Sequence, residues 1–358
     1  MRDIPALSTD EETRALRLHD ESLVVITYGG PFSSPRAIRG WRSGHLSQSG
    51  VWVPPTKTAV SDQLVPDMVA GGVDCVVAHA GSEDDLCLWL REFQTSGSDV
   101  VQARTAADVR TAHDLGKASF ILNGAGAGAG SIENELNRIL LFYQAGVRIW
   151  ALTHSARNPI SGGCGEAEGP GLTNLGKLYV EELNQQRIAI DISHISDRGF
   201  WDVIELSSAP IMASHSNSRS VCSHGRNLTD EMIRKIGAGG GIICLNFFPH
   251  FVSKTDPTVE NIVDHIDKIN EITGAGHVGL GPDFCAGRWG SVLQSWWSTG
   301  SADHNAKSLV VNYPKGAEDT TKMQNVTRSL VKRGYSDDDI RGVMGENFLR
   351  YFERVVGE

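Results

Sequence analysis

The sequence is short of the features that mark secreted and membrane proteins. No apolar run comes near the roughly 20 residues that a membrane-spanning helix needs. The first residues, Met1 to Glu12, are acidic and polar, unlike a secretory signal. The six cysteines are scattered, and none stands in a C-x-x-C pair, so neither a disulfide framework nor a zinc–thiolate cluster is indicated. We therefore expect a soluble, cytoplasmic protein with reduced thiols.

Positive charge is also in short supply. Lys and Arg number 33 against 43 for Asp and Glu, which gives a formal net charge of −10. This balance disfavours nucleic acid and anionic membrane surfaces as partners and leaves a small molecule as the expected ligand. With 358 residues, 40% of them hydrophobic, the chain can bury a large core as one barrel domain or as two smaller domains.

Short apolar runs alternate with segments of helical periodicity along most of the chain. Eight such runs predict buried strands, at residues 23–28, 73–79, 118–123, 147–154, 188–194, 210–215, 240–246 and 277–283. Eight strand–helix units predict an α/β fold of the (β/α)8 TIM-barrel type. We expect a single domain, residues 1–358, with long loops at 32–57 and 284–316 and a helical segment at the carboxyl end.

The alternative is an open doubly wound sheet, which would be expected to carry a glycine-rich phosphate turn after its first strand. Gly29-Gly30-Pro31 does not fit, because Pro31 removes an amide donor where a phosphate would dock. The glycine run at 124–130 is better placed, between a strand and a helix. However, no lysine follows it as in a P-loop, and its spacing departs from G-x-G-x-x-G. A nucleotide site is therefore disfavoured.

Three histidines and a carboxylate lie at the expected carboxyl ends of strands. They are His154, His194, His215 and Asp283. This end of a barrel carries the active site in enzymes of this fold. Neutral imidazole is the nitrogen ligand that zinc prefers, and adjacent strand ends can bring two of them together. A metal site, or a cluster of proton donors and acceptors, is indicated at the barrel mouth.

A series of short motifs resembles, in order, the signature of the membrane (renal) dipeptidase family, peptidase M19 of the amidohydrolase superfamily. The motifs are Leu152-Thr-His154, Asp191-Ile-Ser-His194, Ser214-His-Ser-Asn-Ser218, Gly225-Arg-Asn227, Gly279-Leu-Gly-Pro-Asp-Phe284 and Met344-Gly-Glu-Asn-Phe-Leu-Arg350. The likeness extends from about Glu21 to Val355. It implies a barrel of the metal-dependent hydrolase type, commonly a homodimer, that hydrolyses dipeptides at a two-zinc site.

The resemblance assigns a role to each matching residue. His194 and His215 would be the two imidazole ligands of one zinc ion. His154 would contact the carbonyl oxygen of the substrate and stabilise the oxyanion. Arg226 would bind the carboxylate of a small substrate, which suits its planar fork of donors. Asp283 would carry a proton from the attacking water to the leaving amine.

Two positions depart from the family pattern. The family's first strand ends in His-x-Asp, whereas this chain has Ile26-Thr-Tyr-Gly29. The family's third strand ends in a bridging Glu, whereas residues 117–131 contain no acidic side chain and Asn123 is the nearest polar one. An intact two-zinc site is therefore not expected. We assign Tyr28 and Asn123 to substrate binding and expect at most one zinc, at His194 and His215 with Asp283 as a conceivable third ligand.

Three functions remain open at this point. The first is a dipeptidase-like hydrolase of a small amide or dipeptide-like acid. The second is a lyase, dehydratase or isomerase that uses the same pocket without metal, with the histidines as proton donors and acceptors. The third is an inactive binding homologue. Cys164, in a loop after the fourth strand, and Cys285, two residues after Asp283, are additional candidates for a ligand or nucleophile.

Overall fold

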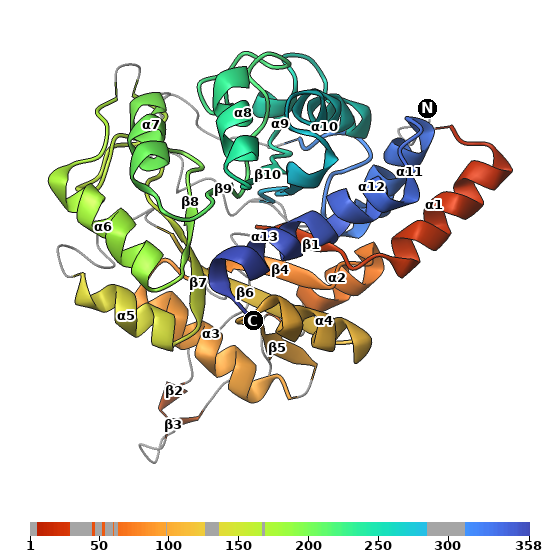
Figure 1. Cartoon of the computed structure of the whole chain (residues 1–358). Coiled ribbons are helices and arrows are strands. Elements are labelled where there is room, and N and C mark those ends of the chain that lie inside the picture. The colour runs from red at the N-terminus through yellow and green to blue at the C-terminus, as the bar shows by residue number, and fades with distance from the viewer. Residues whose placement is uncertain are drawn as a thin grey trace.

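A closed sheet of parallel strands forms the centre of the computed structural model, which describes residues 6–28, 45–46, 52–53, 60, 64–97, 99–125, 136–166, 169–284 and 312–358 (Figure 1). Neighbouring strands follow the order β4-β1-β11-β10-β9-β8-β7-β6, and pairing between β4 and β6 closes the ring. The strands are β1 (Val25–Thr27), β4 (Cys75–His79), β6 (Ala118–Ala125), β7 (Val147–Ala151), β8 (Ala189–Asp191), β9 (Met212–Ala213), β10 (Ile242–Leu245) and β11 (Val278–Leu280). The predicted (β/α)8 barrel is confirmed.

Three further strands were not predicted. β5 (Val100–Gln102) pairs in parallel with the first residues of β6. β2 (His45–Leu46) and β3 (Trp52–Val53) form a small antiparallel pair within the segment predicted as a long loop. The residues around this pair lie outside the described part of the chain. So does most of the other predicted loop, which includes Cys285.

Helices follow the strands and cover the outside of the barrel (Figure 1). They are α1 (Thr9–Glu21), α2 (Val65–Gly71), α3 (Glu83–Thr95), α4 (Ala106–Asp114), α5 (Asn137–Gln144), α6 (Asn174–Gln185), α7 (Asp197–Leu206), α8 (Asp230–Ala238), α9 (Pro249–Val252), α10 (Val259–Thr273), α11 (Gln324–Lys332), α12 (Asp337–Arg341) and α13 (Asn347–Val356). Most begin after a serine or threonine whose hydroxyl accepts a backbone N–H of the first turn, as Ser196 does for α7 and Thr229 for α8. None of the described helices has the length and apolarity of a membrane span.

The barrel interior is a packed core. Alternate strand residues face inward and form one apolar cluster, which includes Val25, Val77, Ile121, Ile149, Ala189, Met212 and Cys244. Phe348 and Phe352 of α13 belong to the same cluster. The turn before α13 lies against the residues that precede β1, because a Cβ on Gly345 would meet the carbonyl oxygen of Leu23 at 2.2 Å. The carboxyl-terminal helix therefore closes the amino-terminal end of the barrel.

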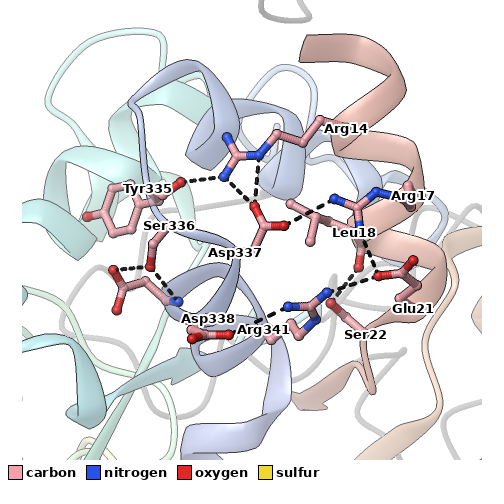
Figure 2. Close-up of polar contacts among 11 residues, drawn as sticks. Arg14, Arg17, Leu18, Glu21, Ser22, Tyr335, Ser336, Asp337, Asp338 and Arg341 are labelled. Carbon is pink, nitrogen blue, oxygen red and sulfur yellow. Dashed lines mark hydrogen bonds and ion pairs between the residues drawn. The ribbon is translucent and has the colours of Figure 1, made fainter. Parts of the chain in front are cut away.

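The two ends of the chain are joined by a network of ion pairs between α1 and α12 (Figure 2). Asp337 accepts hydrogen bonds from Arg14 at 2.6 Å and from Arg17 at 3.1 Å. Glu21 accepts from Arg17 and from Arg341, each at 2.9 Å. The bonds that join α1 to α12 connect residues more than 300 positions apart in the sequence: 323 for Arg14–Asp337, and 320 for both Arg17–Asp337 and Arg341–Glu21. It holds the first helix against the last part of the fold.

Candidate active site at the barrel mouth

A layer of polar side chains lies directly above the apolar interior of the barrel. Each of these residues comes two positions after an interior apolar residue and so shares its inward face. They are Thr27, His79, Asn123, Asp191, Ser214 and Asn246. All of them stand at the carboxyl ends of strands, and all but His79 are buried. Buried polar groups need partners inside the protein, so this layer has to form a connected network.

Asp191 is the buried anion of this network. It is 0% exposed, and its Oδ1 accepts the backbone N–H of Ser193 at 3.0 Å and that of Ser214 at 2.9 Å. The Ser214 hydroxyl donates to Oδ2. Burial raises the pKa of Asp191, while these hydrogen bonds and the charge of Arg226 act against the shift. Both oxygens act as acceptors, which suits a carboxylate that orients its neighbours rather than one that exchanges protons.

The proton positions on the two predicted metal-ligand histidines follow from this anion. Because the Ser214 hydroxyl donates to Asp191, its oxygen has to accept the Nδ1–H of His215, 2.6 Å away. The Nε2 of His215 is then an acceptor. It lies 2.9 Å from the Nε2 of His194, which is therefore the donor. The remaining nitrogen, Nδ1 of His194, keeps a free lone pair.

Both imidazoles are held in their neutral form. Burial, followed by the positive charge of Arg226, lowers the pKa of His194 and of His215 well below the ordinary value. The exposed ring of His154 stacks on His194 with centroids 4.2 Å apart and an angle of 23° between the planes. Its pKa is lowered to about 4, by the protein atoms packed around it and by Arg226. All three rings are therefore neutral near pH 7.

Arg226 brings a positive charge under the histidines. It is 5% exposed, and its guanidinium donates to the Ser216 hydroxyl and to the backbone oxygen of His215, both at 2.8 Å. Its Nε has no hydrogen-bond partner in the described part of the chain. Within the described residues, no carboxylate lies at ion-pair distance from it. Arg226 also lines a small cavity with His194 and Arg219. The structure thus places the predicted carboxylate-binding residue beside the predicted catalytic histidines.

Tyr28 and Asn123 occupy the strand ends where the family resemblance puts metal ligands. The Asn123 amide donates to the Tyr28 hydroxyl at 2.8 Å, and the Tyr28 ring meets His215 edge-on with centroids 4.8 Å apart. The Asn123 side-chain oxygen is buried and has no hydrogen-bond partner among the residues that the structure describes. Burial raises the pKa of Tyr28 well above its usual value, so the phenol remains protonated. These two side chains bring hydroxyl and amide groups, but no anionic ligand, to the mouth.

Asp283 reaches the site from the end of β11, between β1 and β10. Its Oδ2 accepts the Asn246 amide at 3.2 Å, and the same amide lies 3.3 Å from the backbone oxygen of His215. The Tyr313 hydroxyl holds the Asp283 carbonyl at 2.5 Å. Tyr28, His194 and Asp283 have φ of 54°, 73° and 56°, and the other described non-glycine residue with positive φ is Arg187. Strained backbone thus gathers at the barrel mouth, as it does at many functional sites.

The donor set does not fit a zinc ion. A catalytic zinc takes three protein ligands, and two imidazole nitrogens converge here. Among the described residues, no three His, Cys, Asp or Glu side chains are grouped so as to hold a metal. This corrects the idea that Asp283 completes a one-metal set with His194 and His215. Cys164 does not complete it either, because its Sγ faces the other nitrogen of His194, at 3.9 Å.

The structure brings together seven residues that the sequence analysis predicted for the site, and beside them lie residues to which the sequence analysis gave no role. Tyr28, Asn123, His154, His194, His215, Arg226 and Asp283 are all brought to the mouth of the barrel. Asp191, Ser214 and Asn246 were not assigned roles, although strand parity alone would have placed them on the inward face. His79 closes β4, where burial lowers its pKa, and its ring lies near enough to His154 for the two to repel when charged.

Comparison with known families agrees with this architecture. The sequence profile of the membrane dipeptidase family (peptidase family M19) matches residues 88–293 and 309–356. The chain belongs to the membrane dipeptidase family. The match covers most of the barrel strands and the closing helix, but it begins after β1 and β4. The first strand, where the dipeptidase pattern of ligands is missing, is thus in the part that the profile does not match.

Two curated members of the dipeptidase family are similar to most of this chain. Dipeptidase tcpJ of Claviceps purpurea is 29% identical over 288 residues, which are 78% of this chain and 61% of that protein. Dipeptidase aclJ of Aspergillus oryzae is 29% identical over 262 residues, which are 70% of this chain and 55% of that protein. The chain therefore spans a little over half the length of these relatives.

Solved structures agree with the fold. An amidohydrolase from Pseudomonas aeruginosa superposes with a TM-score of 0.77 and 24% identity, covering 96% of this chain and 99% of that chain. A metallopeptidase from Rhodobacter sphaeroides, liganded with a phosphinate mimic of the dipeptide L-Ala-D-Ala, superposes with a TM-score of 0.71 and 23% identity over 94% of this chain and 100% of that chain. At this level of identity the likeness establishes the barrel.

Proposed function

We propose that this protein hydrolyses the amide bond of a small dipeptide-like acid at the mouth of its barrel. The observation that carries the proposal is the buried guanidinium of Arg226, which has no carboxylate partner among the described residues and lies against His215. A buried cation with open hydrogen-bonding capacity favours an anionic ligand. Membership of the dipeptidase family supports a carboxylate-bearing dipeptide as that ligand.

The side chains supply binding and proton transfer. Arg226 would anchor the substrate carboxylate through its unpartnered Nε. His154, exposed above His194, would donate a hydrogen bond to the carbonyl oxygen as negative charge develops on it. The neutral His194 and His215 would hold or move the proton that passes to the leaving amine. Zinc has no part in this scheme, because the donors present do not fit it.

Replacing Arg226 tests the anchor. For Arg226→Gln we expect kcat/KM on carboxylate-bearing dipeptides to fall by about 30-fold or more, because loss of one partner of a buried charge pair costs roughly 2 kcal/mol or more. The measurement is turnover across a panel of dipeptides and their carboxamide analogues, with thermal unfolding as a check on folding. Carboxamides, which carry no charge, should be little affected by the substitution.

Arg219→Gln is the matched control. Arg219 lines the same cavity, but its guanidinium is already paired with Asp197 in two contacts of 2.7 Å. Four of its five N–H donors are engaged by Asp197, Asn227 and Gly225, and its charge is already paired, so activity should change much less. Equal losses in both variants, or none in Arg226→Gln, would contradict the role of Arg226.

A second candidate is proton-transfer chemistry without hydrolysis, as in a lyase, dehydratase or isomerase. The paired neutral imidazoles of His194 and His215, 2.9 Å apart, favour it, because they can give and accept protons with no metal. Product analysis in heavy-oxygen water separates the two functions. Hydrolysis places the solvent oxygen in the product acid, whereas elimination or isomerisation does not. An inactive binding homologue would retain the substrate and release no product.

The oligomeric state of the protein is also part of the proposal. The family resemblance supports a homodimer in a cytoplasmic setting, and light scattering of the purified protein measures its mass directly. The single domain over residues 1–358 stays a prediction in the same way.

A further inference from the structure

A cysteine lies against the catalytic histidines on the side away from the expected metal position. Cys164 belongs to the loop that follows β7, and its backbone N–H donates to the carbonyl oxygen of His194 at 2.8 Å. Gly163 forms a β-bridge with Ile195 next to it. These contacts fix the loop on the residues after β8. They place the half-buried Cys164 Sγ 3.9 Å from Nδ1 of His194.

The series of hydrogen bonds that begins at Asp191 makes Nδ1 of His194 an acceptor. The proton order from Asp191 through Ser214 and His215 leaves His194 with its proton on Nε2 and a lone pair on Nδ1. The lone pair faces the thiol. A nucleophile beside a base, with the base oriented by further groups that end on a buried carboxylate, is the arrangement that activates serine and cysteine nucleophiles.

The position of the Cys164 sulfur suits a nucleophile and does not suit a metal ligand. An ion held by Nε2 of His194 and Nε2 of His215 would lie beyond the ring from Cys164. The thiol therefore cannot join those two nitrogens around one ion. It can, however, pass its proton to the ring nitrogen that it faces.

An independent feature indicates where a substrate would sit. Arg226 is 5% exposed, and its Nε has no hydrogen-bond partner within the described ranges; its guanidinium lines a small cavity that His194 and Gly225 also line. The carbonyl oxygen of Cys164 is 3.6 Å from the point where a Cβ on Gly225 would lie. The loop that carries Cys164 therefore lies next to Gly225, one of the residues that line this cavity. In the proposal that follows, a small acid would bind with its carboxylate directed toward Arg226 and its amide carbonyl toward the thiol.

We propose that Cys164 is the nucleophile of this enzyme and that His194 is its base, an inference that rests on the proposed amide hydrolysis. The sulfur attacks the amide carbonyl carbon as Nδ1 of His194 takes the thiol proton. The C–N bond then breaks, the leaving amine takes that proton, and a thioester remains on Cys164. Water, deprotonated by His194, attacks the thioester, the C–S bond breaks, and the thiol recovers its proton as the acid leaves.

The resting state of the thiol is consistent with a base-assisted attack. Burial raises the pKa of Cys164, and the charge of Arg226 acts in the opposite direction. The sulfur therefore rests as a thiol and depends on His194 when it reacts.

Acetylation by p-nitrophenyl acetate tests the pair without knowledge of the natural substrate. After incubation and acid quench, peptide mass mapping compares Cys164 with the exposed Cys87 of the same chain. We expect Cys164 to be acetylated in the wild type and its rate to fall by about 100-fold in His194→Gln, while Cys87 reacts equally in both. Equal rates at Cys164 in the two proteins, or labelling confined to Cys87, would overturn the proposal.

Cys164→Ala and Cys164→Ser complete the test, with circular dichroism as the check on folding. In folded variants, turnover of the dipeptides cleaved by the wild type should be lost in Cys164→Ala. Retained turnover would refute the nucleophile and leave the hydrolase function standing. If the wild type cleaves no dipeptide but acetylates Cys164 in a His194-dependent manner, the nucleophile stands and the proposed substrate class fails.

Discussion

Asp191 determines the chemistry of two histidines that it does not touch. Its carboxylate accepts a hydrogen bond from the Ser214 hydroxyl. That bond fixes the position of the proton on His215 and, through it, the position of the proton on His194. A single buried charge therefore decides which ring nitrogens donate and which accept. Its effect is similar to that of the aspartate in a catalytic triad, but it is transmitted through a serine and a second imidazole.

Asp191→Asn keeps the shape of this side chain and removes its charge. The amide presents donors to groups that are themselves donors, so a buried hydrogen bond is lost. We expect the free energy of unfolding to fall by about 1–3 kcal/mol. Activity should fall by about 100-fold or more because the histidine protons are no longer ordered. Urea unfolding and steady-state kinetics measure the two effects.

Asp202→Asn is the control for this change. Asp202 accepts one backbone N–H, that of Leu172, at 2.7 Å, and lies on α7 outside the site. The Asp202→Asn variant should have a lower free energy of unfolding than the wild type and an unchanged kcat. An Asp191→Asn enzyme with full activity would show that the proton order inferred here is not used.

At the scale of single elements, His265 of helix α10 is bonded to the loop after β9 and to the end of helix α9. It is 0% exposed, and its Nδ1 accepts the backbone N–H of Ser218 at 3.2 Å. Its Nε2–H donates to the carbonyl oxygen of Val252 at 3.0 Å. The bond from Ser218 requires a neutral ring, and burial lowers the pKa of His265 to about 4. A proton on this ring would break the bond to Ser218.

The loss of stability in acid should therefore depend on His265. The unfolded chain binds a proton at this residue below about pH 6.5, and the folded chain does so only below about pH 4, so stability falls as the pH drops between these values. For His265→Gln, whose amide can still donate and accept, we expect the decrease in unfolding free energy from pH 7 to pH 4.5 to be smaller by about 2–3 kcal/mol. Urea unfolding at the two pH values measures it, and equal decreases would contradict the assignment.

The contact between α1 and α12 is a second element-scale feature. Asp337→Asn removes the acceptor shared by Arg14 and Arg17 (Figure 2). We expect a loss of less than about 1 kcal/mol in unfolding free energy, and a smaller loss in high salt, because the residues are partly exposed and their charges are screened. The neighbouring Asp338→Asn is the matched control, since that side chain is 99% exposed and meets Arg341 at 3.6 Å. Equal effects of the two changes would rule out a special role for Asp337.

At the scale of the whole molecule, the missing ligands on β1 and β6 predict a metal-independent enzyme. Tyr28 and Asn123 replace anionic or imidazole ligands with a phenol and an amide that bond to each other. We expect purified protein to contain far less than one zinc per chain by elemental analysis, and its turnover to survive dialysis against a chelator. Stoichiometric zinc whose removal abolishes activity, and whose return restores it, would contradict this prediction.

The sequence allowed the barrel to be predicted almost strand by strand because each strand is a short apolar run that ends in polar residues. β5 was missed because a strand of three residues, Val100–Gln102, has no periodicity to read. The strand-end histidines were found for the same reason that the barrel was. The contact between Cys164 and His194 could not be foreseen, because it depends on the path of a loop whose conformation is fixed by backbone bonds to a distant strand.

The left-handed backbone at Tyr28, His194 and Asp283 has a consequence for how such a barrel can be improved. Each of these residues holds a conformation that costs an ordinary side chain about 1 kcal/mol or more and costs glycine nothing. A laboratory search that rewards only heat resistance would tend to place glycine at these positions. The most durable barrels from that search would be those that had lost the groups gathered at the mouth. At these three positions, selection for catalytic activity would keep the present side chains, whereas selection for thermal stability would favour glycine.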